Sequence, residues 1–190
     1  MKKTFIIALL VVSGSLFAQK DCVYSINDTT KDQELKTTMD HLMYEKVFGG
    51  SSQFVFFSLS NSQGVPLVNF QLLAKSKDFP KSYCLDGASR IYLQLANNKI
   101  VTLINAAQEQ CSTLIYDEIE KNNIRTLNGT FLFTKGSLED LKESPISFIR
   151  VKYVGETVDY PMKRELVSET MKKTYKPETY FIDNLKCIEE

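Results

Sequence analysis

The chain has 190 residues, enough for a single domain; 43% of them are hydrophobic, 24% charged and 11% aromatic. With only 8 Gly and 5 Pro, collagen-like and low-complexity chains are excluded. Lysine plus arginine, and aspartate plus glutamate, number 23 each, so the formal net charge is zero. The two signs are interspersed, and we therefore expect no nucleic-acid partner, which would need a basic stripe or patch.

The N-terminus has the pattern of a secretory signal peptide. Lys2 and Lys3 supply positive charge, residues 5–12 form the apolar run FIIALLVV, and small residues lead to Ala18. We expect a signal peptide over residues 1–18 and a single exported domain, periplasmic or extracellular, over residues 19–190. The apolar run is shorter than the roughly 20 residues that cross a bilayer, and no second run reaches that length, so no membrane span is predicted. Removal of the two lysines leaves 21 basic against 23 acidic residues, a mature charge of about −2.

The first half of the exported domain reads as strands separated by turns. Residues 22–26 alternate as in a strand, whereas residues 35–47 fit either a helix or an extended segment. Gly49 to Ser52 is a break. Residues 54–59, FVFFSL, form the clearest strand because they are aromatic and β-branched, and residues 67–73 return after a turn.

A hairpin is predicted around Asn97 and Asn98. Two strand-like runs, 91–96 and 99–104, flank these residues, and asparagine tolerates the positive φ that a two-residue type I′ turn requires. In such a hairpin the numbers of paired residues sum to 195, so that Leu95 faces Ile100.

All four cysteines lie in the exported domain, and an even number there favours disulfides, with three possible connectivities. Cys84 and Cys111 also sum to 195, so extending the hairpin ladder would bring them together. We therefore favour Cys84–Cys111, which leaves Cys22–Cys187 to join the two ends of the domain. No C-x₂-C spacing occurs, and His41 is the only histidine, so neither a metal site nor another cofactor is predicted.

The second half adds helices to the predicted strands. Residues 106–121 begin as strand and end in a helix or loop, and Ser137, with Asp140 three residues later, caps a short helix over 138–143. Further strands are expected at residues 129–134, 146–153 and 157–160. Residues 163–173 and 177–188 have helical character, the latter from apolar residues at three- and four-residue steps. These elements predict an α+β fold: antiparallel β-hairpins with a short inserted helix and a helical C-terminal segment.

Four phrases of the chain resemble small exported single-domain proteins of unknown function from Gram-negative bacteria. They are the early cysteine strand DCVY, the hairpin phrase SRIYLQLANNKIVTL, the phrase GSLEDLKESPISFIRVKY, and the near-terminal KCI. The resemblance implies export and a single domain, and it favours extended structure over residues 35–47. It implies no activity.

No assembled catalytic constellation is apparent. His41 follows Asp40, but the exported domain lacks the G-x-S-x-G elbow of a serine hydrolase, and we interpret His41 as a surface residue. Acidic residues gather in two clusters, which suit a solvated surface better than paired catalytic carboxylates: Asp117, Glu118 and Glu120; Glu139 and Asp140. Asn27 and Asn128 match the N-glycosylation pattern, and Gly49 to Ser52 lacks the lysine of a phosphate-binding loop.

Three functional hypotheses follow, and the sequence favours a protein that is not an enzyme. The leading one is a disulfide-stabilised exported protein that binds another protein or a glycan; the 12 Phe and 9 Tyr could include a carbohydrate platform, although Trp is absent. The rival is a hydrolase of envelope or extracellular glycans that uses two carboxylates from the acidic clusters. The third is a component of an assembly, for which an exposed strand edge would be diagnostic.

Overall fold

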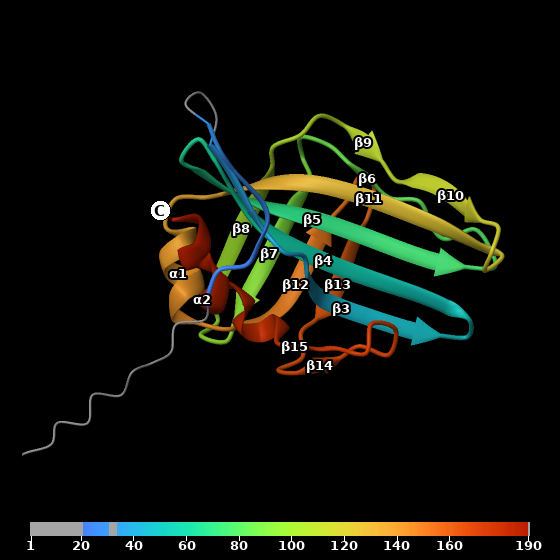
Figure 1. Cartoon of the computed structure of the whole chain (residues 1–190). Coiled ribbons are helices and arrows are strands. Elements are labelled where there is room, and N and C mark those ends of the chain that lie inside the picture. The colour runs from blue at the N-terminus through green and yellow to red at the C-terminus, as the bar shows by residue number, and fades with distance from the viewer. Residues whose placement is uncertain (1–20, 31–33, 190) are drawn as a thin grey trace, which may run out of the picture.

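A computed structural model describes residues 21–30 and 34–189 (Figure 1). The predicted signal peptide lies outside these residues. Strands account for 55% of these described residues and helices for 12%. The fold is therefore β-rich, built on one antiparallel sheet of 11 strands, and the prediction of an α+β fold with a helical C-terminal segment is wrong.

Three long strands form the middle of the sheet: β4 (Ser51–Ser62), β5 (Val65–Ser76) and β11 (Asn122–Phe133). The shorter strands of the same sheet are β1 (Tyr24–Thr29), β2 (Glu34–Thr38), β3 (His41–Phe48), β7 (Arg90–Leu95), β8 (Ile100–Asn105), β10 (Thr113–Asp117), β12 (Ile146–Lys152) and β13 (Thr157–Pro161). The main path runs β1-β2-β4-β5-β11-β8-β7-β12-β13, with β3 beside the first half of β4 and β10 beside the first half of β11.

The sheet curves around its own core. In the middle of β4, β5 and β11, buried apolar side chains alternate with outward-facing ones, and they share one face, which we call the inner face: Val55, Phe57 and Leu59; Val68, Phe70 and Leu72; Leu127 and Phe131. Tyr44 of β3 meets Tyr160 of β13 with ring centroids 5.1 Å apart, although these strands belong to distant parts of the sheet. The inner face therefore encloses one large hydrophobic cluster.

The chain after Met162 is less helical than predicted. Within residues 163–173, β14 (Leu166–Val167) leads into a turn, in which Lys172 has a φ of 54°, and the chain returns as β15 (Thr174–Tyr175). The turn forms because the Ser168 hydroxyl accepts a hydrogen bond from the Met171 N–H and the Ser168 carbonyl accepts one from Lys172. The apolar residues of this segment pack on the outer face of β3 and β4, forming a second cluster around Leu42 and Phe54.

Residues 177–188 form three short turns rather than one helix: η1 (Pro177–Thr179), α2 (Tyr180–Asn184) and η2 (Leu185–Ile188). Their buried side chains pack into the inner cluster.

The inserted helix is present as α1 (Ser137–Glu143), but its N-cap is Gly136 with a φ of 82°, so the predicted cap at Ser137 is wrong. The Ser137 hydroxyl instead lies 2.7 Å from that of Thr134.

The hairpin of β7 and β8 has a different register from the predicted one. Paired residues sum to 194, so that Gln94 faces Ile100, and Leu95 N–H donates to the Lys99 carbonyl across a three-residue loop. Only Asn98 takes a positive φ, of 68°, whereas a type I′ turn needs two such residues.

The extended structure expected for residues 35–47 is present in β2 and β3.

Both predicted disulfides are present in the structure. Cys22 is bonded to Cys187, and Cys84 to Cys111. The second pair lies in a separate two-stranded ladder, β6 (Cys84–Leu85) with β9 (Gln110–Cys111), because the Asp86–Ser89 turn interrupts the hairpin ladder. No helix among residues 21–30 and 34–189 is long and apolar enough to cross a membrane.

Candidate functional site: a polar groove on the outer face

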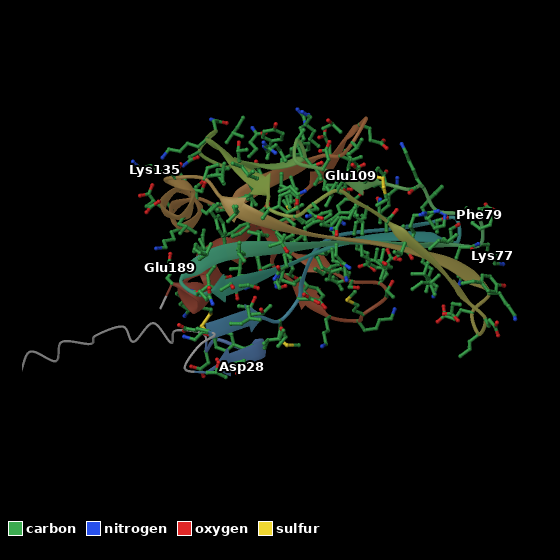
Figure 2. The ribbon with its side chains drawn as sticks, turned by 90° about the horizontal axis from the view of Figure 1, so that it is seen from above. Asp28, Lys77, Phe79, Glu109, Lys135 and Glu189 are labelled. Carbon is green, nitrogen blue, oxygen red and sulfur yellow. A yellow bond between two sulfur atoms is a disulfide. The ribbon has the colours of Figure 1, made fainter. Side chains whose placement is uncertain are left out.

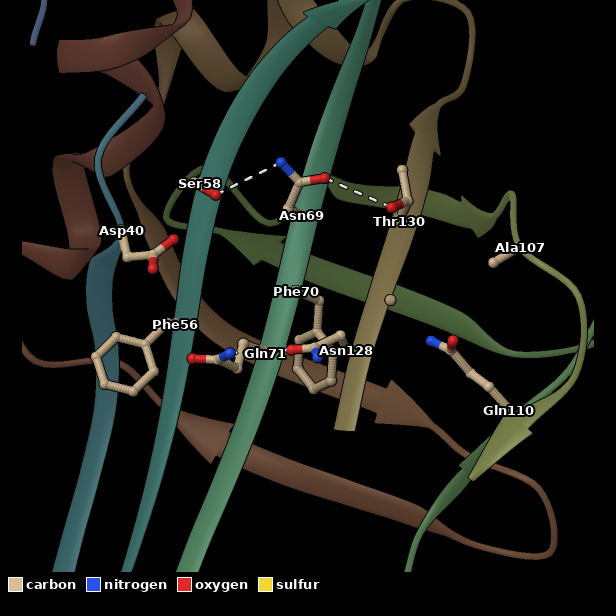
Figure 3. A pocket seen from close by; sticks show the side chains of 11 residues that line it. Asp40, Phe56, Ser58, Asn69, Phe70, Gln71, Ala107, Gln110, Asn128 and Thr130 are labelled. Carbon is tan, nitrogen blue, oxygen red and sulfur yellow. Dashed lines mark hydrogen bonds between the residues drawn. The ribbon is translucent and has the colours of Figure 1, made fainter. Parts of the chain in front are cut away.

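A groove of about 280 Å³ lies across β4, β5 and β11, on the face opposite the main core (Figure 3). We call it the outer groove. Its floor is polar and consists of Ser58, Asn69, Gln71, Asn128 and Thr130.

The strand period and the pairing register put these five side chains on one surface. Each alternates with a core residue, as Ser58 does with Phe57, so all five point away from the core. Asn69 is paired with Ser58 on one side and Thr130 on the other. One pair of residues further along β5, Gln71 is paired with Asn128. The floor is thus two parallel rows of hydroxyl and amide groups.

Hydrogen bonds within the floor fix the orientation of its amides. Asn69 Nδ2 donates to Ser60 Oγ at 2.6 Å, and Thr130 Oγ1 donates to Asn69 Oδ1 at 3.5 Å. Gln71 Nε2 donates to Asn128 Oδ1 at 3.0 Å. Each side-chain amide has two donors and two acceptor lone pairs, so these bonds leave capacity for a ligand in the groove.

The two walls of the groove differ in chemistry. Asp40, from the link between β2 and β3, and Phe56, from β4, lie on one side, and Ala107 and Gln110 lie on the other (Figure 3). Asp40 is exposed and Phe56 is partly exposed. Among the described residues, the lining contains no lysine, arginine or histidine and no second carboxylate. The groove therefore presents neutral hydrogen-bonding groups, one aromatic ring and one negative charge.

Gly129 connects the groove to the disulfide-bonded ladder behind it. A Cβ at this position would lie 2.6 Å from Leu85 Cδ1, so a larger residue would have to displace the Leu85 side chain of β6, which packs against the inner side of β11 here. The Cys84–Cys111 bond anchors β6 and β9, and Gln110 of β9 lines the groove. The disulfide therefore supports both the floor and one wall.

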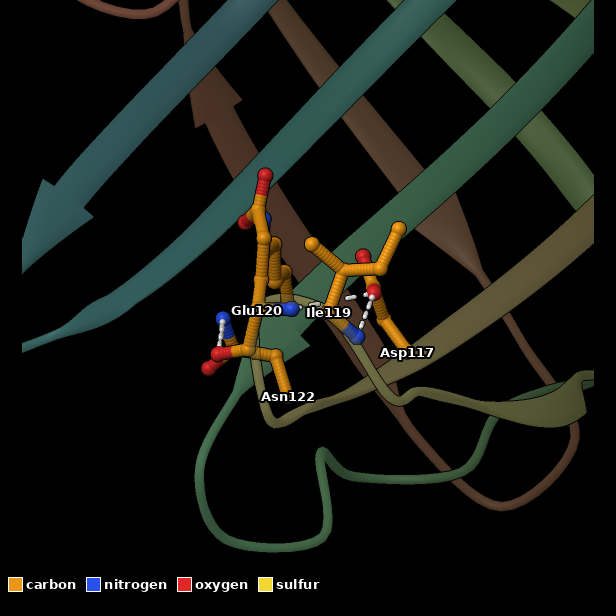
Figure 4. Close-up of polar contacts among 5 residues, drawn as sticks. Asp117, Ile119, Glu120 and Asn122 are labelled. Carbon is orange, nitrogen blue, oxygen red and sulfur yellow. Dashed lines mark hydrogen bonds and ion pairs between the residues drawn. The ribbon is translucent and has the colours of Figure 1, made fainter.

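The structure separates the two acidic clusters. Asp117, Glu118 and Glu120 lie at the turn between β10 and β11, where the Asp117 carboxylate accepts hydrogen bonds from the Ile119 and Glu120 N–H groups (Figure 4). Glu120 forms an ion pair with Lys75. Glu139 and Asp140 lie on α1, at the opposite end of the molecule, and Asp140 pairs with Lys99 (Figure 1). The clusters do not converge in one cleft.

The other singled-out residues have structural settings. His41 is partly buried between the rings of Tyr175 and Tyr180, at centroid distances of 5.3 and 4.8 Å, rather than lying on the open surface as expected. Gly49 and Gly50 form the turn between β3 and β4 with φ values of 58° and 78°, and Asn27 is exposed on β1. Among residues 21–30 and 34–189, no three His, Cys, Asp or Glu side chains gather as a metal site would require.

The strongest pKa perturbations lie in the core, away from the outer groove. Burial raises the pKa of Tyr153 and of Tyr160 well above the usual tyrosine value. Their hydroxyls are 2.9 Å apart and form a buried hydrogen bond. Because both side chains are at most 2% exposed, the pair stabilises the fold and does not contact a ligand.

Sequence reasoning missed the groove floor. The sequence alone identifies Asn128 only as a glycosylation match and Asp40 only as a neighbour of His41. A usable signal existed: polar residues recur at every second position in Ser58-Leu59-Ser60, Asn69-Phe70-Gln71 and Asn128-Gly129-Thr130. What the sequence lacked was the register that aligns these segments.

No protein-family model, curated protein sequence or solved structure matches this chain.

Proposed function

We propose that this chain is an exported, disulfide-stabilised binding protein whose outer groove binds a neutral saccharide. The observation that carries the proposal is the floor itself: rows of amides and hydroxyls from three adjacent strands, with an aromatic ring at the edge. Sugars present closely spaced hydroxyls on one side and an apolar C–H surface on another. Side-chain amides can both donate to and accept from such hydroxyls.

The walls narrow the ligand class. Phe56 offers an aromatic ring for the apolar face of a sugar, and Asp40 is an acceptor for sugar hydroxyls. The same carboxylate repels phosphate, sulfate and uronic acid groups, and no lysine or arginine in the described lining offsets it. A neutral oligosaccharide therefore fits better than an anionic one.

The groove supports binding rather than hydrolysis. A two-carboxylate glycosidase needs its carboxyl groups roughly 5–10 Å apart. Asp40 is the single carboxylate of the described lining, and Ser58 has no histidine in that lining to serve as its base.

The binding test is an NMR titration of the oxidised, ¹⁵N-labelled protein with a panel of neutral hexose oligosaccharides and a matched uronic acid panel. We expect chemical-shift changes centred on Asn69, Gln71 and Asn128 with a neutral member of the panel. Gln71→Ala and Asn128→Ala should each weaken binding about tenfold, the loss of about 1.4 kcal/mol. The control is Gln94→Ala, an exposed strand amide outside the groove, which should bind as the parent does.

Two results would contradict this assignment. One is absence of binding to every neutral oligosaccharide tested; the other is binding that Gln71→Ala and Asn128→Ala leave unchanged. Asp40→Asn sharpens the test, because it should improve binding of the uronic acid panel by removing a repulsive charge.

Export is tested separately on the chain made in a Gram-negative host. We expect the mature protein to begin at Gln19 and to contain no alkylatable thiol, since all four cysteines form disulfides. Full-length protein recovered from the cytoplasm with free thiols would oppose export without bearing on saccharide binding.

A further inference from the structure

β10 is an edge strand without the usual protection. Its five residues pair with β11 on one side, and within residues 21–30 and 34–189 no backbone hydrogen bond joins its other side to another segment. Three consecutive apolar side chains are exposed: Leu114 by 41%, Ile115 by 58% and Tyr116 by 52%.

Proteins usually protect such edges with lysine, proline, a bulge or a covering segment. Residues 113–117 contain no lysine or proline, and their register with β11 is regular. The edge of β3 shows the contrast: the Glu45 carboxylate accepts hydrogen bonds from the N–H groups of Glu169 and Thr170, so the chain beside β14 lies against it. The edge of β10 is therefore available for a strand.

The sequence of β10 is complementary to itself. In an antiparallel pairing centred on Ile115, Ile115 faces its own copy, Leu114 faces Tyr116, and Thr113 faces Asp117. The three central pairs are then apolar, and each end places a hydroxyl opposite a carboxylate. Moving the centre to Tyr116 would instead place Asp117 opposite Ile115, so the centred register is favoured.

We infer that β10 pairs with β10 of a second copy of this chain, antiparallel about Ile115, so that two sheets join into one. The exposed backbone N–H and C=O groups of β10 can be paired by another strand. The symmetric pattern of apolar and polar residues in β10 identifies that strand as β10 of the second copy. Two five-residue edges bury less than the roughly 1,200 Å² typical of stable interfaces, so the dimer is weak and depends on concentration. The inference does not depend on saccharide binding in the outer groove.

The test is sedimentation velocity of the oxidised protein from about 10 µM to about 1 mM, the range suited to a weak complex. We expect the parent to shift from monomer to dimer as concentration rises. Ile115→Lys and Ile115→Glu should each remain monomeric, because like charges would meet at the twofold axis. An equimolar mixture of the two should dimerise again, since lysine then faces glutamate.

Ile100→Lys is the matched control, because Ile100 is 65% exposed on another strand, and it should dimerise as the parent does. Thermal unfolding of each variant checks that the fold is retained. A parent that stays monomeric over the whole range overturns the inference. So does an Ile115→Lys variant that still dimerises, or a mixture that does not.

Discussion

At one end of the molecule the C-terminal helical turns and α1 lie against the core, whereas at the other end strand ends project beyond it (Figure 2). We call these the helical end and the distal end. Tyr180, Phe181 and Leu185 are buried at the helical end, and Phe48, Phe79 and Ile119 are 79%, 75% and 93% exposed at the distal end.

The three long strands β4, β5 and β11 run from the helical end to the distal end. Twelve extended residues span about 40 Å, which is more than the inner cluster covers. The register aligns Val47, Ser52, Lys75, Ile124 and Ile115 in one row, so the turns after β3, β5 and β10 all lie at the distal end. Burial therefore concentrates stability at the helical end, and the distal end provides surface for contacts.

The largest expected loss of stability comes from removing the Cys22–Cys187 disulfide, which joins the two ends of the exported domain. Replacing Cys22 and Cys187 by alanine should lower the free energy of unfolding by about 5 kcal/mol, and replacing Cys84 and Cys111 by about 3.5 kcal/mol, since the closed loops differ in length. The separations are 165 and 27 residues. Urea unfolding of the two double variants measures the difference, and equal losses would show that loop length does not determine the contribution.

The next largest loss of stability is expected for a buried phenylalanine at the helical end, compared with an exposed phenylalanine at the distal end. Phe181→Ala should destabilise the protein by about 3–5 kcal/mol, because the ring packs against Phe57 and Phe133 at centroid distances of 6.1 and 6.3 Å. Phe79→Ala should change stability by less than about 0.5 kcal/mol, because its ring is exposed. Similar losses in urea unfolding would remove the distinction between the ends.

The sequence predicted the elements whose signal is local. The strand run around Phe57 and the return strand of β5 follow from alternation and turn residues. The cysteine pairing was predicted correctly from a hairpin register that the structure does not have. The helix predicted over residues 163–173 is absent because Leu166 and Met171 pack on the outer face of a sheet. That face depends on which strands are neighbours, which spacing along the chain does not encode.

The outer groove was not predictable for the same reason. Ser58, Asn69 and Asn128 are ordinary polar strand residues until β4, β5 and β11 are aligned. The Asn97 hairpin shows how a small error in loop length alters strand pairing. The loop has three residues rather than the predicted two, so the numbers of paired residues sum to 194 instead of 195. A shift of one residue between strands exchanges their inner and outer faces.

The smallest of the three stability effects is a loss of stability at alkaline pH. Burial raises the pKa of Tyr153 and Tyr160 above the value of 10.0 that a solvated tyrosine has. Below pH 10 both residues are protonated in the folded and unfolded states, so the full stability is present. Above pH 10 the unfolded chain loses these protons and the folded protein keeps them, so stability falls by up to about 2.7 kcal/mol per pH unit for the two residues.

The double variant Tyr153→Phe/Tyr160→Phe isolates this contribution. It removes both hydroxyls of the buried 2.9 Å hydrogen bond together, so neither is left without its partner. Urea unfolding between pH 8 and pH 11 should show a shallower decline in this variant than in the parent. Tyr116→Phe at the distal end is the control and should leave the decline unchanged, because that side chain is 52% exposed in the folded protein. An equally steep decline in the double variant would mean that other groups, and not this buried pair, make the protein sensitive to alkali.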